Sequence, residues 1–167
     1  AHTIDPHNTI YLTGYLSNDD FKLNNDTTYK YSNRNANIKW KHNFNNQFYG
    51  VLTAGIDDYK YSVSSVFVPV NGYKLGFDIG QKYGRLDFNL NPNNRHAIDF
   101  GISSIYYQLH PGSFEPVGSA SLIAKNIVAE ERGLESAVYL GDQYAIDSNL
   151  SVNAGVRFSV FNYLGPH

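Results

Sequence analysis

Apolar and polar residues alternate with a period of two along almost the whole chain, and turn residues separate the runs. In the clearest run, the even-numbered positions from Leu150 to Val160 are apolar, while Ser151, Asn153 and Arg157 point to the opposite face. The pattern predicts an all-β, antiparallel chain of about seven strands, at approximately 8–23, 29–44, 47–62, 73–91, 95–108, 134–146 and 149–163.

The apolar phase changes within the predicted strand 73–91. Its apolar residues are odd-numbered at first and even-numbered later: Leu75, Phe77 and Ile79, then Leu86, Phe88 and Leu90. One extra residue in a β-bulge shifts the alternation in this way, and glycine is common at bulges. We therefore expect a bulge between Gly80 and Gly84.

The connections and strand lengths favour a membrane barrel. The segments 44–47, 91–94 and 147–149 predict tight turns, whereas 24–28, 63–72 and 109–133 are longer. Short turns at one end and long loops at the other are the layout of outer-membrane barrels. Strands of about 14 to 19 residues exceed the globular mode of roughly 5 to 6 residues. The sequence thus predicts a segment of a transmembrane β-barrel.

Aromatic side chains agree with this layout. Phe44 and Phe48 flank a tight turn, and Tyr106 lies at the long-loop end, where aromatic girdles are expected. His42 is a polar residue on an otherwise apolar face. The apolar phase predicts lipid contact for nine residues: Leu12, Ile38, Trp40, Leu52, Ile56, Phe100, Val152, Val156 and Phe158.

Composition narrows the chemistry. The net charge of -2 gives no reason to expect a nucleic-acid partner, and the absence of Cys excludes a disulfide framework and a zinc–cysteine site. The six His residues lack a metal-ligand spacing, and no catalytic motif occurs. We expect no enzyme activity, no metal and no cofactor. Aromatic residues make up 15% of the chain, which suits surfaces where rings meet both water and an apolar phase.

Several segments resemble one family when their order and spacing are taken together. They are His96 to Gly101, Ser104 to Tyr107, Pro111 to Pro116, Leu134 to Gln143, Leu150 to Ser159 and Phe161 to Pro166. These segments resemble the barrel of TonB-dependent outer-membrane receptors, especially those of Bacteroidota. The earlier segments Ile38 to His42 and Asn71 to Leu75 look like the same barrel, so the resemblance covers nearly the whole chain.

The resemblance implies energised uptake of a scarce nutrient across the Gram-negative outer membrane. Receptors of this family have a plug, a short box that recruits the TonB energy-coupling complex, and about 22 strands. Residues 1–167 would then be part of one barrel, with the plug, the box and the remaining strands outside this chain. The implied partners are outer-membrane lipid, the TonB complex, an unidentified nutrient and, for some receptors, a surface lipoprotein. The implied substrate side is the loop 109–133 and the strand end Asp57 to Tyr61.

Two other readings remain open from the residues alone. A soluble β-sandwich also buries one apolar face per strand, and its Tyr-rich surface would suit glycan binding. A passive small barrel is the third reading, and it requires an even number of strands in a closed sheet.

Overall fold

A computed structural model describes residues 1–23 and 26–166 of the chain. Its strands are β1 (His2–Asp5), β2 (Asn8–Leu23), β3 (Thr27–Asn43), β4 (Phe48–Ser65), β5 (Tyr73–Asn93), β6 (His96–Pro116), β7 (Asn126–Ile127), β8 (Glu131–Ala145) and β9 (Ser151–Pro166). One short 3-10 helix, Pro69–Asn71, follows β4. All seven predicted strands are confirmed, and β1 and β7 are two short strands that the alternation does not reveal.

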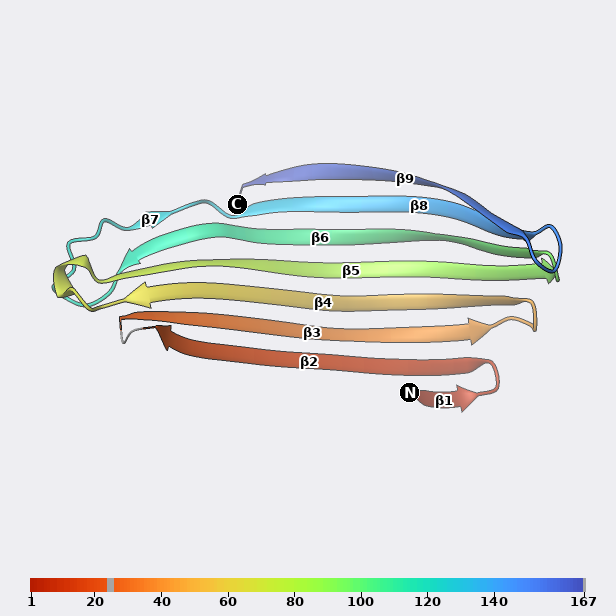
Figure 1. The fold of residues 1–167 in the computed structure, drawn as a ribbon, viewed down its shortest axis with the longest axis horizontal. Coiled ribbons are helices and arrows are strands. Elements are labelled where there is room, and N and C mark those ends of the chain that lie inside the picture. The colour runs from red at the N-terminus through yellow and green to blue at the C-terminus, as the bar shows by residue number, and fades with distance from the viewer. Residues whose placement is uncertain (24–25, 167) are drawn as a thin grey trace.

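All the strands belong to one antiparallel sheet with the order β1-β2-β3-β4-β5-β6-β8-β9, and β7 pairs with the far end of β6. Sequence neighbours are therefore spatial neighbours, and the sheet forms an open meander (Figure 1). The all-β, antiparallel prediction is confirmed. No helix in the described part of the chain is long and apolar enough to cross a membrane.

The short connections lie at one end of the sheet and the long ones at the other (Figure 1). At each of four short turns an Asp or Asn side chain accepts a hydrogen bond from a backbone N–H two residues further on, an arrangement that stabilises tight turns. The four acceptors and their bond lengths are Asp5 at 2.7 Å, Asn45 at 2.8 Å, Asn93 at 2.9 Å and Asp147 at 2.7 Å.

The long-loop end differs in detail from the prediction. β6 continues to Pro116, so the segment between β6 and β8 runs over 117–130 and contains β7. The predicted connection 24–28 lies partly outside the described residues.

The predicted bulge between Gly80 and Gly84 is wrong. β4 and β5 pair without interruption from Ser65 opposite Tyr73 to Phe48 opposite Leu90. The pairing of β5 with β6 is irregular at two other places, between Gly76 and Asp78 and between Leu90 and Asn93. The change of apolar phase therefore has another cause, which the two faces of the sheet reveal.

The sheet is a single layer with almost no internal core. Among the described hydrophobic residues only Val63, at 8% exposure, and Ala137, at 5%, are buried. A sheet of this kind depends on its surroundings to cover its apolar face.

Candidate functional site

The nine residues predicted to contact lipid lie on one face of the sheet. Strand register shows this: Leu12 is opposite Ile38, and Trp40 is opposite Leu52. Directly opposed residues share a face, and residues two apart on one strand do as well. Leu12 is 75% exposed and Val156 is 74% exposed. The structure thus brings the nine together as an open apolar surface, called here the apolar face, and its contact with lipid stays a prediction.

The apolar face has the height that a membrane requires. On β4 its side chains run from Phe48 to Ile56, and on β9 from Val152 to Val160, which is nine residues on each strand. A tilted barrel strand needs about 9 to 11 residues to cross the hydrocarbon. Beyond Ile56 the same face of β4 becomes polar, with Asp58 and Lys60. The apolar residues therefore form a band, with polar surface on its long-loop side.

A row of aromatic rings borders this band at the short-turn end. The Phe44 and Phe48 ring centroids are 4.6 Å apart, Phe48 lies 5.7 Å from Phe88, and Phe88 lies 5.2 Å from Phe100. His42 packs edge-on to Phe44 at 4.6 Å, so this polar residue sits at the border of the band. Rings at such a border can keep an apolar body in lipid and a polar edge in water.

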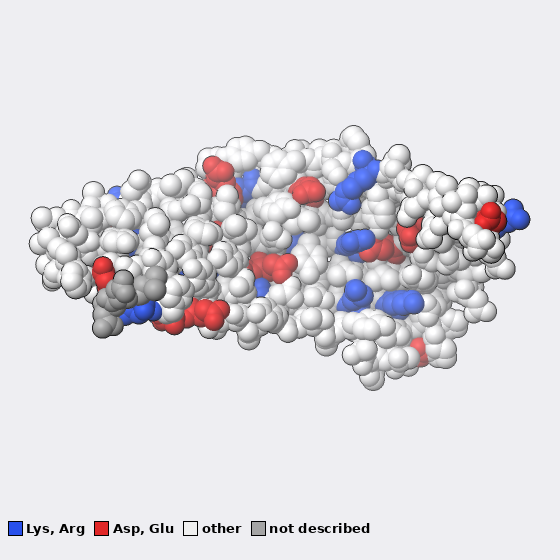
Figure 2. Space-filling model, in the orientation of Figure 1, with Lys and Arg blue, Asp and Glu red and all other residues white. Residues whose placement is uncertain are grey.

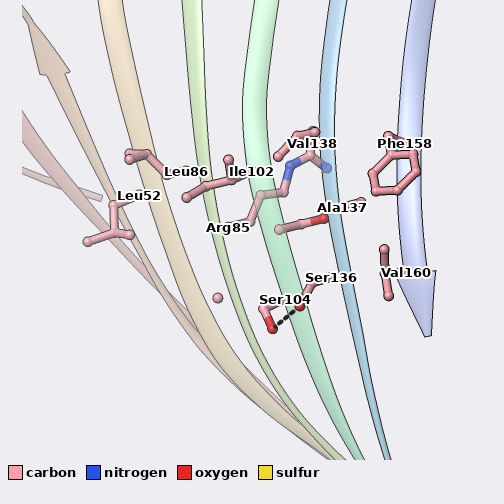
Figure 3. Close-up of a pocket in the computed structure, with 12 residues that line it drawn as sticks. Leu52, Arg85, Leu86, Ile102, Ser104, Ser136, Ala137, Val138, Phe158 and Val160 are labelled. Carbon is pink, nitrogen blue, oxygen red and sulfur yellow. Dashed lines mark hydrogen bonds between the residues drawn. The ribbon is translucent and has the colours of Figure 1, made fainter. Parts of the chain in front are cut away.

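A hollow of about 590 Å³ interrupts the apolar face (Figure 3). Leu52, Leu86, Ile102, Phe158 and Val160 are among the residues around it. Two of the serines that line it pair with each other, since the Ser104 and Ser136 hydroxyl oxygens are 3.1 Å apart. A hydroxyl that faces an apolar phase is costly unless it is paired, so this hydrogen bond suits a lipid-facing site.

The opposite face is polar in its short-turn half. The Arg85 guanidinium Nε lies 2.6 Å from Asp87 Oδ1, and the Tyr139 hydroxyl donates to the same carboxylate. The Lys41 ammonium lies 4.2 Å from the centroid of the Tyr49 ring, a cation–π contact. Figure 2 shows charges of both signs interspersed across the middle of one broad face of the sheet. This polar half suits a water-filled or protein-filled interior.

The long-loop half of the same face carries an aromatic ladder, consisting of Phe21, Tyr29, Tyr31, Tyr59, Tyr61 and Phe77. The Phe21 and Tyr29 rings stack at 4.9 Å, and Tyr31 and Tyr61 approach to 5.1 Å. Phe77 lies 5.2 Å from Tyr61. The ladder continues from one strand to the next across β2 to β5 and forms a wide aromatic surface beyond the height of the apolar band.

The ladder explains the phase change on β5. Phe77 is opposite Tyr61 and Ile79 is opposite Tyr59, so both lie on the face away from the apolar band. Leu86 is opposite Leu52, so it lies on the apolar face. The strand itself is regular, and its apolar residues change sides because its surroundings change along its length. Sequence reasoning missed the ladder because it assumed one apolar face for the whole strand.

Two adjoining hollows lie on this face next to the ladder. One measures about 330 Å³ and is lined by Tyr15, Asn33 and Asp57, among others. The other measures about 420 Å³ and is lined by Tyr107, Glu135 and Phe161, among others. Ile79 and Gln81 line both hollows. The two hollows together are called here the trough, and they bring together residues from seven strands, β2 to β6, β8 and β9.

A cluster of charged side chains ties the end of the long loop to the sheet. His110 Nδ1 lies 2.7 Å from Asp78 Oδ2, and His110 Nε2 lies 3.0 Å from Glu130 Oε2. Arg132 Nε donates to Glu130 Oε1 at 2.6 Å, and this hydrogen bond is the largest cause that holds the pKa of Glu130 below its ordinary value. Gln108 donates to the same oxygen at 2.8 Å. The cluster fixes the loop where β8 begins.

The described residues contain no group of three His, Cys, Asp or Glu side chains arranged to hold a metal ion. The predicted substrate-side residues Asp57 to Tyr61 fall into two sets: Asp57, Tyr59 and Tyr61 lie on the trough face, and Asp58 and Lys60 lie on the other.

A family model described as TonB dependent receptor-like, beta-barrel, matches residues 2–165 of the chain. No curated protein and no solved structure matches the sequence or the fold of this chain. The matched segment includes the apolar face, the aromatic row, the ladder and the trough.

Proposed function

Since the chain belongs to the TonB-dependent receptor-like β-barrel family, we propose that it forms part of the wall of an outer-membrane receptor that takes up a nutrient with energy from the TonB complex. In this role the apolar face contacts outer-membrane lipid. The polar face lines the interior, and the long loops face the outside of the cell.

The apolar band carries this proposal. It is nine residues high on β4 and β9, it is largely exposed, and aromatic rings border it at the short-turn end. A soluble β-sandwich would bury this face against a second sheet. The described residues form one sheet only, and two hydrophobic residues are buried in it. Lipid is the covering that fits both the height and the aromatic border of the band.

The sheet edges support a larger barrel. In the strand order, β1 and β2 end the sheet on one side and β9 ends it on the other. An unpaired strand edge in lipid leaves backbone N–H and C=O groups without hydrogen-bond partners. Each such group destabilises the structure by several kcal/mol, on the order of the penalty for any buried polar group without a partner. We propose that further strands of the receptor pair with these edges, so that residues 1–167 are one part of a single barrel domain.

The remaining roles belong to the whole receptor. The plug and the box that recruits the TonB complex would lie outside these residues, with the plug against the polar face that carries Arg85 and Asp87. The nutrient would enter from the long-loop end, and a surface lipoprotein would act there in receptors that have one.

The test begins with the native protein. We expect it in the outer-membrane fraction, and we expect release only by detergent. Cells that lack the receptor and cells that lack TonB should lose growth on the same scarce nutrient. A protein that stays monomeric and soluble without detergent would contradict the proposal and favour the β-sandwich. Nutrient uptake that persists in cells without TonB would be compatible with a membrane barrel, but it would exclude transport that is driven by the TonB complex.

A further inference from the structure

We propose that the outside of this sheet holds one phosphorylated membrane lipid, with an acyl chain in the hollow of about 590 Å³ and the phosphate beside Lys82. The side of the sheet that carries the apolar band, over the full length of the strands, is called here the band face. The proposal rests on the proposed function for the membrane around the barrel. The site itself rests on two hollows of the band face and on the charges around them.

The larger hollow has the shape of a seat for an acyl chain. Leu52, Ile102 and Phe158 are among the apolar side chains around it (Figure 3). Gly84 leaves it open in the middle, because a Cβ atom there would meet nothing within 4 Å. Within lipid the hydrophobic effect does not favour one chain over another, so van der Waals contact in such a seat decides which chain stays.

This hollow offers little to water or to a charged group. Ser104 and Ser136 hydrogen-bond to each other, and a water molecule needs two to four polar partners to occupy a cavity. Arg85 also borders the hollow, but its guanidinium lies on the opposite face, where it pairs with Asp87. A hydrocarbon chain is therefore the filling that fits.

A second hollow, of about 310 Å³, follows the first one toward the long loops. Ile56, Lys82 and Tyr106 line it, and strand register places these three side by side on the band face. Lys82 and Gly84 are two residues apart on β5, which is about 7 Å along the strand. One lipid molecule can therefore reach both hollows.

The depth of Lys82 matches the position of a lipid phosphate. Ile56 is the last apolar residue of the band on β4, and Lys82 is directly opposite it. A lysine at the edge of the hydrocarbon extends its ammonium group toward the headgroups. Anionic lipid headgroups attract basic side chains at this level.

The two faces of the sheet differ in charge at and beyond the level of Ile56. Register places all the Lys and Arg residues of the described strands in this half on the band face: Lys22, Lys30, Arg34, Lys60, Lys74, Lys82 and Arg132. The opposite face carries acids there, namely Asp19, Asp57 and Glu131. The field of the sheet therefore attracts an anion to the band face.

The band face also carries acids, and each of them is already engaged. Asp58 and Asp78 line the second hollow together with Lys82. The acids and their basic partners are Asp20 with Lys30 at 2.7 Å, Asp58 with Lys60 at 3.8 Å, Asp78 with His110 at 2.7 Å, Glu115 with Lys125 at 3.5 Å and Glu130 with Arg132 at 2.6 Å. Among the described residues Lys82 forms no ion pair, so a phosphate can approach it without breaking one.

The test uses the whole receptor, freed of bound lipid in detergent, and native mass spectrometry with three probes. The probes are dipalmitoyl phosphatidic acid, dipalmitoyl glycerol, which lacks the phosphate, and inorganic phosphate, which lacks the chains. We expect one phosphatidic acid to bind at least fivefold more tightly than the glycerol lipid, and no inorganic phosphate to bind. Lys82→Gln should weaken binding of the phosphatidic acid about fivefold, the contribution of one basic residue near a membrane surface. Gly84→Leu should fill the seat and weaken binding of both lipids.

A matched control separates the site from the overall charge. Lys39→Gln removes a lysine from the opposite face, where Lys39 is opposite Thr53, and should leave the affinity unchanged. Each variant is first checked for heat-modifiable folding. Equal affinities for the two lipids, equal effects of Lys82→Gln and Lys39→Gln, binding of inorganic phosphate as tight as that of the lipid, or a receptor dimer without bound lipid would each overturn the inference. A TonB-dependent transporter with no lipid preference overturns this inference alone, whereas a native protein that is soluble without detergent overturns the proposed function as well.

Discussion

A positive charge in the middle of the apolar band should destabilise the barrel that is folded in lipid. Val156 is opposite Leu140, and on β9 it lies midway between Val152 and Val160, the two ends of the band. In the proposed receptor its side chain would therefore lie at the centre of the hydrocarbon, and 74% of its surface is exposed on the sheet. An arginine at the midplane of a barrel costs about 2–4 kcal/mol. Val156→Arg in the whole receptor should lose stability by this amount.

Asn153 provides the matched control on the same strand. It is opposite Gln143, on the polar face, so Asn153→Arg should change stability by less than about 1 kcal/mol. A second comparison tests depth: Val152→Arg, at the end of the band, should cost only about 0–1 kcal/mol. The assay is folding into lipid vesicles at increasing urea, with heat-dependent gel mobility as the measure of folded barrel. Equal folding yields for Val156→Arg and Asn153→Arg would refute the assignment of the faces.

Two further predictions concern single contacts. At Gly101 a Cβ atom would lie 2.7 Å from the Tyr139 hydroxyl, whereas at Gly84 it would meet nothing within 4 Å. In urea unfolding, Gly101→Ala should therefore lower the free energy of unfolding by about 1–3 kcal/mol, and Gly84→Ala should leave it unchanged. A larger loss for Gly84→Ala than for Gly101→Ala would contradict the strand register. The hydrogen bond from Arg132 keeps the pKa of Glu130 low in the folded protein. The ionised Glu130 carboxylate therefore stabilises the folded loop above the ordinary glutamate pKa of 4.5, and this stabilisation is lost as the pH falls through the lower pKa that Glu130 has in the folded protein. Limited proteolysis at neutral pH and at a pH below the folded pKa of Glu130 checks this. The loop before Glu130 should be cut more easily at the acidic pH, whereas in the Glu130→Gln variant it should be cut equally at the two pH values.

The strands and the face of each residue in the band follow from the sequence alone. On β9 every second residue from Val152 to Val160 is apolar, and only a strand with one face in an apolar phase gives this pattern over nine residues. The nine predicted lipid-facing residues share one face for the same reason. The tight turns were also predictable, because Asn and Asp occur where their side chains can accept backbone N–H groups.

The trough and the ladder were not predictable, since their signal was attributed to a bulge. Phe77 and Ile79 on β5 are apolar and lie on the face opposite Leu86, because the strand passes out of the hydrophobic band and into a different environment. Periodicity reports which residues share a face, but it does not report what that face touches. The trough joins residues that are far apart in the sequence, such as Tyr15 on β2 and Tyr107 on β6, and only the strand register shows that they lie on the same face.

The central claim is that one face of this sheet contacts lipid and the other does not. Its most direct test is a spin-label scan of positions 150–160 in the whole receptor reconstituted into vesicles. The label's exposure to oxygen, which concentrates in lipid, is compared with its exposure to a water-soluble nickel complex. The account predicts a period of two, with oxygen exposure highest at positions 152, 154, 156, 158 and 160. Equal exposure to both reagents along the strand, or the opposite phase, would contradict it.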